Sequence, residues 1–434
     1  MNWSDIVKYS KEDILKIVEE EDVEFIRLQF TDIFGNLKNM AVTTSQIEKV
    51  LNNKCIFDGA AVEGFTHNTK SDLVLYPDLD TFTIFPWRPQ NGKVGRLICN
   101  VFNLDGTPYE GDSRYILKKV IKEAADMGYV VDVGPECEFF LFDCDEDGNS
   151  TTNTGEKGSY FDVGPIDKGE NARRDLVMTL EDMGFEVRSS YHEVEPAQHE
   201  IDFKNDDALN TADNIMTFRM TVRTVARKHG LHATFMPKPR TDFRGSGMTI
   251  NFAMYNEPGK NIFANKDDKY GLSDIGYSFM AGVMEHLNSI TAICNPIINS
   301  YKRLRNETNA PCNKGWSTNE RSMCIRIPID MDECIISFRS PDSAANPYLA
   351  IAVFIAAGLD GIKRQLSPIS YEENLGTLPD SIEKALEALK QDKFIKNVLG
   401  EGIADKFVSV KEQEWNDYCK HVSEWELDKY LDRI

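Results

Sequence analysis

The feature that most constrains the fold is one long apolar segment that carries two acidic side chains. Residues 129–143 read YVVDVGPECEFFLFD, a pattern that predicts a β-strand. Side chains alternate across a strand, so Glu136 and Glu138 fall on one face and Cys137 on the other. The phenylalanines that follow predict a central strand. Two carboxylates there repel each other unless a cation or donor compensates, so they are candidate metal ligands.

The charge and composition of the chain exclude several classes of protein. The 434 residues include 49 Lys and Arg against 70 Asp and Glu, which gives a net charge of −21. This surplus argues against binding to nucleic acid or to an anionic membrane, because phosphate contacts need clustered basic side chains. The longest apolar run, residues 348–359, is too short to span a bilayer. With no C-x-x-C pair among nine cysteines and no signal peptide, we expect a cytoplasmic protein with reduced thiols.

The first hundred residues mix one helix with several strands. A capping box and helical spacing of apolar residues predict a helix over residues 10–20. Alternation predicts strands at 23–32 and 40–44. Residues 72–87 predict two strands joined by a turn at Pro77.

The glycine- and proline-containing segment 103–113 is the predicted linker between two domains, residues 1–103 and 104–434. Beyond it, helices are expected at 113–127, 206–229, 268–291, 346–364 and from 379 onward, and strands at 129–143, 186–192, 198–204, 231–236, 247–254 and 323–327. Because the strands bunch instead of alternating strictly with helices, we expect an α+β fold with a mostly antiparallel sheet.

A second acidic cluster lies between two strand-like segments. It brings His192, Glu193, Glu195, His199 and Glu200 together within nine residues. Carboxylates and imidazoles are suitable ligands for a cation. A solvated loop is the alternative for this cluster alone, and pairing it with the first cluster favours a cation site.

Basic and glycine-rich segments predict recognition of an anion. Arginines occur inside segments that otherwise read as core strand, namely Arg303, Arg321, Arg326 and Arg339, with Lys302 beside them. Guanidinium groups suit phosphate or carboxylate, and structural ion pairs are the alternative. The run Gly245-Ser246-Gly247-Met248 permits close backbone approach, but it is neither a Walker loop nor a full G-x-G-x-x-G.

Two further patterns do not carry a function. The run of acids that begins at Asp143 resembles the start of a calcium loop, but its twelfth position is Thr154 instead of Glu. A polar hairpin turn is the better interpretation. Cys137 has no histidine placed by the sequence to activate it as a nucleophile.

Together these segments resemble the bacterial type I glutamine synthetases over nearly the whole chain. The matching stretches are IRLQFTDIFGNLKN, FDGAAVEGF, SDLVLYPDLDTFTIFPW, VGPECEFFLFD, HEVEPAQHEID, ATFMPKP, GSGM, NSYKRL, RSMCIRIP and FRSPDSAANPYLA. The resemblance implies a β-grasp N-terminal domain, a larger catalytic domain with a curved antiparallel sheet, and homo-oligomeric hexameric or dodecameric rings with shared sites. It also implies ATP, two divalent cations (Mg or Mn) and phosphorylation of a glutamate carboxylate before ammonia displaces the phosphate.

The resemblance also assigns site residues. The first metal site falls on Glu138, Glu193 and Glu200. The arginines that handle glutamate and phosphate fall on Arg303, Arg321, Arg326 and Arg339. Asp58 matches the acid that helps to bind ammonium, and Gly245 and Asn251 fall on the substrate and nucleotide side.

The chain departs from the family pattern at the second metal site. Glu136 remains there, but Thr249 stands for the histidine and Ser337 for a later glutamate. Arg244 replaces an asparagine that contacts the substrate, and Asn309 replaces the flap glutamate that accepts the ammonium proton. Glu307 could serve as that base only if the flap shifts by two residues.

These departures lead us to expect weak or lost glutamine formation. If Arg244 points inward, its charge cancels that of Glu136, so a second cation would bind poorly. An asparagine cannot act as a base, and losing a general base costs about 10²–10⁴ in rate. Three hypotheses follow: a regulatory or binding paralogue with one remaining metal site, which we favour here, a ligase with a changed substrate, and an ordinary glutamine synthetase.

Overall fold

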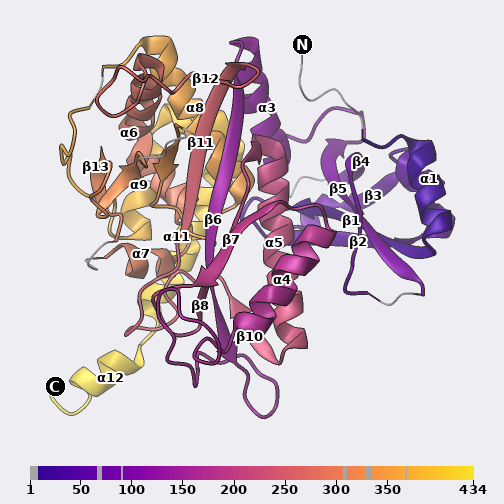
Figure 1. Cartoon of the computed structure of the whole chain (residues 1–434), viewed down its shortest axis with the longest axis horizontal. Coiled ribbons are helices and arrows are strands. Elements are labelled where there is room, and N and C mark those ends of the chain that lie inside the picture. The colour runs from indigo at the N-terminus through magenta and orange to yellow at the C-terminus, as the bar shows by residue number, and fades with distance from the viewer. Residues whose placement is uncertain (1–7, 66–70, 89–90, 306–309, 329–333, 368) are drawn as a thin grey trace.

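The computed structural model describes the chain in six stretches, and its strands form two separate sheets (Figure 1). The described residues are 8–65, 71–88, 91–305, 310–328, 334–367 and 369–434. A five-stranded sheet lies at one end of the molecule, and a ten-stranded sheet forms its middle with helices packed along it.

The five-stranded sheet is built from the first part of the chain, in the order β2-β1-β5-β4-β3. Its strands are β1 (Val23–Thr31), β2 (Leu37–Thr43), β3 (Cys55–Asp58), β4 (Asp72–Ile84) and β5 (Lys93–Asn103). Helices α1 (Lys11–Glu20) and α2 (Ile47–Leu51) accompany them. The predicted capping box is confirmed, because Ser10 Oγ accepts a hydrogen bond from the Asp13 amide.

The predicted turn at Pro77 is wrong. Residues 72–84 form the single strand β4, which pairs antiparallel with β5 on both sides of an irregularity between Asp78 and Thr83. Within the irregularity, Thr81 Oγ1 donates to the Asp78 carbonyl and accepts from the Ile98 amide at 2.8 Å. The threonine side chain thus replaces ladder hydrogen bonds, so the strand bulges without reversing.

The ten-stranded sheet carries the acidic strand at its centre. Its order is β13-β14-β15-β11-β6-β8-β7, with β9 and β10 paired to β6 and β12 to β11. The strands are β6 (Val130–Asp143), β7 (Val187–His192), β8 (Gln198–Phe203), β9 (Asp206–Asp207), β10 (Leu231–Thr234), β11 (Met248–Glu257), β12 (Lys260–Asn261), β13 (Asn313–Ser317), β14 (Met323–Arg326) and β15 (Ile336–Phe338). The expected mostly antiparallel sheet is confirmed, since only β13 and β14 run parallel among the printed pairs of this sheet.

Helices pack along the large sheet (Figure 1). They are α3 (Ser113–Asp126), α4 (Glu170–Asp182), α5 (Ala208–Lys228), α6 (Asp274–Cys294), α7 (Ile298–Leu304), α8 (Pro347–Arg364), α9 (Ile382–Gln391), α10 (Lys393–Leu399), α11 (Glu401–Lys420) and α12 (Glu424–Tyr430). Nearly all of α8 is buried, as its apolar sequence predicts. Helix α12 protrudes from the body near the C-terminus (Figure 1).

Two other predictions from the sequence have clear outcomes. The acids after Asp143 form a hairpin turn, in which Asp145 Oδ1 accepts from the Asn149 amide at 2.6 Å, as expected. Among the described residues, no helix is both long and apolar enough to cross a membrane.

Candidate active site

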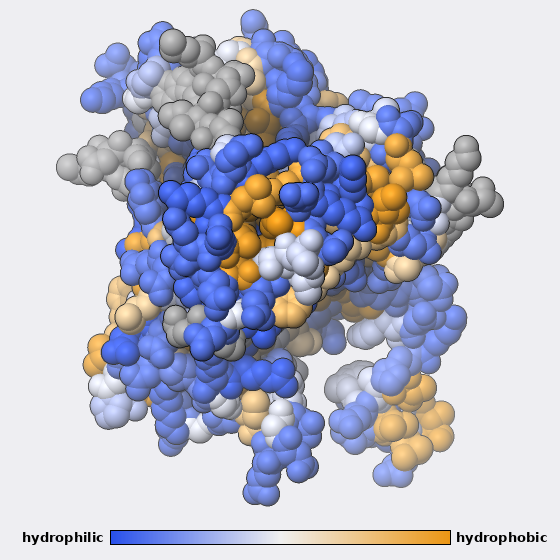
Figure 2. All heavy atoms as spheres, turned by 90° about the vertical axis from the view of Figure 1, so that its right-hand side faces the viewer, coloured by the Kyte–Doolittle hydropathy of each residue, from blue (hydrophilic) through white to orange (hydrophobic). Residues whose placement is uncertain are grey.

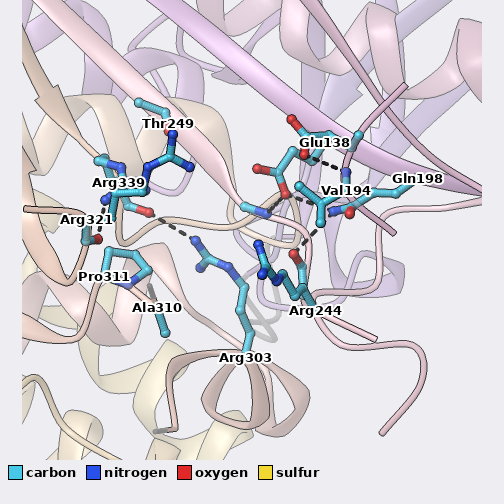
Figure 3. Close-up of a pocket in the computed structure, with 13 residues that line it drawn as sticks. Glu138, Val194, Gln198, Arg244, Thr249, Arg303, Ala310, Pro311, Arg321 and Arg339 are labelled. Carbon is cyan, nitrogen blue, oxygen red and sulfur yellow. Dashed lines mark hydrogen bonds between the residues drawn. The ribbon is translucent and has the colours of Figure 1, made fainter. Parts of the chain in front are cut away.

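A small cavity of about 160 Å³ opens beside Glu138 of strand β6, where residues of the acidic, glycine-rich and arginine-containing segments of the sequence meet. It is lined by Glu138, Glu193, Val194, Gln198, Arg244, Gly245, Gly247, Thr249, Arg303, Ala310, Pro311, Arg321 and Arg339. In Figure 3, Arg321 and Arg339 lie on one side of this pocket and Glu138 on the other, with Arg303 between them.

Three glutamates that the sequence grouped are brought together by the sheet. Glu138 of β6 and Glu200 of β8 are direct cross-strand partners, and Glu193 lies in the hairpin loop just after β7. Burial, followed by the charge of Glu193, raises the pKa of Glu138 to about 7. Burial and the charge of Glu138 likewise raise the pKa of Glu200. Crowded carboxylates that resist ionisation suit a hard divalent cation, so this donor set fits the Mg or Mn that the resemblance implies.

Glu138 is held in place by two donors. The Gly247 amide donates to its Oε2 at 2.8 Å, and Gln198 Nε2 donates to the same oxygen at 3.1 Å. Gln198 also lies within hydrogen-bond distance of the Gly245 carbonyl and the Ser246 hydroxyl. Sequence reasoning gave Gln198 no role, although its spacing of two from Glu200 on β8 places both side chains on one face.

The residues at the second predicted metal site lie side by side on three strands. Glu136 pairs with Thr249 across β6 and β11, and Asn251 pairs with Ser337 across β11 and β15. Asn251 Nδ2 donates to Glu136 Oε1 at 2.9 Å, while Ser337 Oγ donates to Asn251 Oδ1 at 2.5 Å. The structure therefore gives Glu136 an amide partner, and this set offers one carboxylate.

Backbone carbonyls hold the arginines of the pocket. Arg303 of α7 donates to the Ser340 carbonyl at 2.9 Å and to the Arg339 carbonyl at 3.0 Å, and Arg339 donates to the Arg321 carbonyl. Burial and the neighbouring arginines lower the pKa of Arg339 to about 10. These cations are crowded, so the pocket is prepared for an anionic ligand.

The glycines of the G-S-G segment leave space for neighbouring groups of the pocket. A Cβ on Gly247 would lie 2.5 Å from Arg303 Nη2, and one on Gly245 would lie 2.4 Å from the Pro237 carbonyl oxygen. The segment therefore makes room for Arg303 beside β11. Arg326 lies outside the pocket lining, and its Nε donates to the Thr318 carbonyl at 3.3 Å.

The structure places Asp58 away from this pocket and does not describe two other predicted residues. Asp58 is exposed at the end of β3, outside the pocket lining, and its Oδ1 accepts from the Ala60 amide at 2.9 Å. Hydrogen bonds from Ser71 and Ala60 lower the pKa of Asp58. Asn309 and Glu307 lie outside the described residues.

Comparison with known proteins decides the family. Residues 22–104 match the β-Grasp domain of glutamine synthetase, and residues 110–430 match its catalytic domain. The chain belongs to the glutamine synthetase family. This confirms both the resemblance seen in the sequence and the expected fold of a β-grasp domain with a glutamine-synthetase-type catalytic domain.

Named members of the glutamine synthetase family match over almost their full length. The chain is 48% identical over 443 residues to the glutamine synthetase of Clostridium saccharobutylicum, covering 99% of this chain and 100% of that one. It is 49% identical over 440 residues to the glutamine synthetase of Staphylococcus aureus, with 98% of each chain covered.

Two solved structures have a fold similar to that of this chain. The structure of GmaS in complex with ADP has a TM-score of 0.88 at 32% identity, covering 97% of this chain and 99% of that one. The Plasmodium falciparum glutamine synthetase has the same TM-score at 24% identity, covering 98% and 99%, a likeness that shows the fold alone.

The expectation of a protein deficient in glutamine formation is wrong. Relatives at 48–49% identity over nearly the whole chain are glutamine synthetases, which supports an active enzyme in place of a regulatory or binding paralogue. The expected cancellation of charge requires Arg244 to lie beside Glu136, but Arg244 Nε lies 3.7 Å from Glu195 Oε1 with half of its side chain exposed. Glu136 is instead hydrogen-bonded to Asn251, so the cancellation of charge that supported the prediction does not describe this pocket.

Proposed function

We propose that this chain is an active ATP-dependent carboxylate–amine ligase that forms glutamine from glutamate and ammonia. The observation that carries this proposal is the charge of the pocket, where four arginines face two glutamates. The arginines are Arg244, Arg303, Arg321 and Arg339, and the glutamates are Glu138 and Glu193. A triphosphate and a dicarboxylic amino acid need this surplus of positive charge, because both are anionic.

Glu138, Glu193 and Glu200 are the residues that we propose to hold one divalent cation, Mg²⁺ or Mn²⁺. Such a cation neutralises phosphate charge when it is bound. Gln198 and the Gly247 amide orient Glu138 toward this role, because both donate to the same carboxylate oxygen. Glutamine synthetases use ATP and divalent metal, and the choice of Mg or Mn in this chain remains part of the proposal.

The proposed reaction has two steps. A side-chain carboxylate oxygen of glutamate attacks the γ-phosphorus of ATP, and the bond to ADP breaks. Ammonia nitrogen then attacks the acyl carbon and expels inorganic phosphate, which takes up the proton that the nitrogen loses. Arg303, Arg321 and Arg339 bind the transferred phosphoryl group. Backbone carbonyls fix the guanidinium groups of Arg303 and Arg339 before the substrate arrives.

The second cation position is proposed to rely on arginines. Glu136, Asn251 and Ser337 form a hydrogen-bonded chain with a single carboxylate, which is a poor donor set for a divalent ion. The guanidinium groups of Arg321 and Arg339 line the same pocket as Thr249 and supply positive charge for the phosphates there. Gly245 and Asn251 remain proposed contacts on the substrate and nucleotide side.

We further propose that the protein assembles with itself in hexameric or dodecameric rings in the cytoplasm, with Asp58 completing a neighbour's ammonium site. Two features support self-association. Exposed apolar side chains lie on the part that carries the five-stranded sheet, among them Phe25 and Ile56, and Figure 2 shows hydrophobic atoms gathered on that face. Helix α12 has no buried residue and exposes Trp425 and Leu427.

The test measures ADP release by the purified protein with glutamate and ammonium, and with a panel of other carboxylates and amines. We expect ADP release that needs glutamate and ammonium together. The variant Arg303→Lys should lose about 10- to 100-fold, because an ammonium cannot reproduce both hydrogen bonds of the charged fork and the loss of one costs about 1.5–3 kcal/mol. Arg240→Lys is the control, since Arg240 pairs with Asp242 outside the pocket lining. ADP release with a different amine or carboxylate only would overturn the proposal.

A further inference from the structure

A buried polar cluster lies behind the hairpin that carries Glu193. The hairpin, residues 193–197, joins β7 to β8. The cluster consists of Glu156, Asp167, Arg173, His192 and His199, each less than 9% exposed. None of these side chains lines the pocket, so none is explained by contact with substrate.

Glu156 binds both ends of the hairpin. His192 Nε2 at its start lies 2.6 Å from Glu156 Oε1, and the amide of Ala197 at its end donates to the same oxygen. The other carboxylate oxygen accepts from the Lys168 amide at 2.8 Å. Both oxygens are therefore engaged with donors that come from three places in the chain.

The hairpin needs such an anchor because its backbone is strained. Ala197 adopts a φ of +63°, a left-handed conformation that is unfavourable for an alanine. The hydrogen bond from its amide to Glu156 offsets part of this cost. The next residue is Gln198, whose side chain orients Glu138, so the turn at Ala197 sets the geometry of the glutamate cluster.

His192 connects Glu156 to the backbone of Glu193. Its Nδ1 lies 2.6 Å from the Glu193 carbonyl oxygen, while its Nε2 faces Glu156. A carbonyl and a carboxylate both accept hydrogen bonds, so the ring donates through both nitrogens. The imidazole therefore forms a rigid bridge between Glu156 and the backbone of a proposed metal ligand.

The cluster is unsuited to hold a metal ion itself. Arg173 Nη1 donates to His199 Nδ1 at 2.9 Å and to Asp167 Oδ2 at 2.6 Å. Since arginine is only a donor, His199 carries its hydrogen on Nε2 and offers no lone pair there. The same contacts fix β8 next to Glu200, so the cluster supports both strands that carry proposed ligands.

We propose that Glu156 is a positioning residue that, through His192 and Ala197, sets the hairpin so that Glu193 and Glu200 converge with Glu138 on the divalent cation. This rests on the proposed cation site. Replacing a residue that hydrogen-bonds to metal-ligating residues typically weakens metal affinity by about 10- to 100-fold. Glu156→Gln keeps one acceptor oxygen but turns an amide donor toward at least one of the three donors that now bind the carboxylate.

The test measures Mn²⁺ binding to the full protein by electron paramagnetic resonance, with urea unfolding of the metal-free protein alongside. We expect Glu156→Gln to weaken Mn²⁺ binding by about tenfold or more. The matched control is Glu170→Gln, because Glu170 also anchors a loop amide, that of Gly164 at 3.0 Å, without touching the hairpin. The control should bind Mn²⁺ like the natural protein.

The proposal would be overturned if Glu156→Gln bound Mn²⁺ as tightly as the control does. It would also be overturned if Glu170→Gln lost as much Mn²⁺ affinity as Glu156→Gln while both variants lost the same stability. If Glu156→Gln does not fold, both measurements are repeated in an Ala197→Gly background, because glycine adopts this φ freely and relieves the strain. The single variant Ala197→Gly is then compared with the double variant that also carries Glu156→Gln. Metal binding is read without turnover. A natural protein that binds Mn²⁺ but forms no glutamine would therefore contradict the proposed function and leave this inference standing.

Discussion

At the residue scale, Glu138 links the protonation of the pocket to cation binding. Its carboxylate is crowded by burial and by Glu193, which together raise its pKa from the usual 4.5 to about 7. The folded protein therefore binds more protons than the unfolded chain between these two values. A raised carboxyl pKa means that the stability of the metal-free protein falls as the pH rises through this window.

We accordingly predict opposite pH trends with and without a cation. Between pH 4.5 and about 7, the metal-free protein should lose stability toward urea, while Mn²⁺ affinity should rise because the ligands must be deprotonated. Paired urea and Mn²⁺ titrations across this range test the trends. Glu138→Gln should flatten both curves, and an unchanged pH dependence in that variant would refute the assignment.

At the element scale, the start of strand β11 and helix α7 share the space around Arg303. Gly247→Ala would place a Cβ 2.5 Å from Arg303 Nη2, which is the mobile end of a side chain. We expect the guanidinium to shift and its charged hydrogen bond to the Arg339 carbonyl, worth about 1.5–3 kcal/mol when fully formed, to weaken by about 1 kcal/mol. ADP release should therefore fall by about fivefold, with a change in unfolding free energy below about 1 kcal/mol.

Gly402→Ala in α11 is the control for this substitution. A Cβ there meets no atom within 4 Å, so ADP release should be unchanged. A Gly247→Ala protein with full activity would show that the position of Arg303 is unimportant.

The elements differ in how far the sequence reveals them. Strand β6 and helix α8 were predictable, because each is long, apolar and regular in period. Helix α4 was missed, and β4 was split in two because a proline–aspartate pair normally signals a turn. That signal failed since Thr81, by its hydrogen bonds, keeps the bulged chain in the sheet.

The sequence predicts site residues where they form a local pattern. It does not predict residues that contact the site from a distant part of the chain. Glu138 is predicted by alternation along its strand and Glu200 by the cluster of acids and imidazoles at 192–200, and the structure pairs the two directly. Glu156 could not be found, because its contact with His192 joins residues 36 apart in the chain. The weight given to Arg244 was misleading, since spacing does not reveal that its neighbour is Glu195.

At the scale of the whole molecule, helix α12 carries a prediction about assembly. Trp425 is 63% exposed and Leu431 is 70% exposed, which suits a helix that docks on another subunit. Replacing both by serine should lower the mass measured by light scattering, because the docking surface is lost. Met178→Ser, at 55% exposure on α4, should leave the mass unchanged. A natural protein of monomeric mass would contradict the proposed rings. The domain boundary near residue 103 remains a prediction from the sequence.

The most direct test of the proposed function follows oxygen from glutamate to phosphate. Glutamate labelled with oxygen-18 in its side-chain carboxylate is incubated with ATP, ammonium and the purified protein, and the phosphate is analysed by mass spectrometry. Because a carboxylate oxygen attacks the γ-phosphorus and leaves with it, we predict one labelled oxygen in the phosphate released with each glutamine formed. Unlabelled phosphate without glutamine would mean that water is the acceptor, and it would contradict the assignment of this chain as an active ligase.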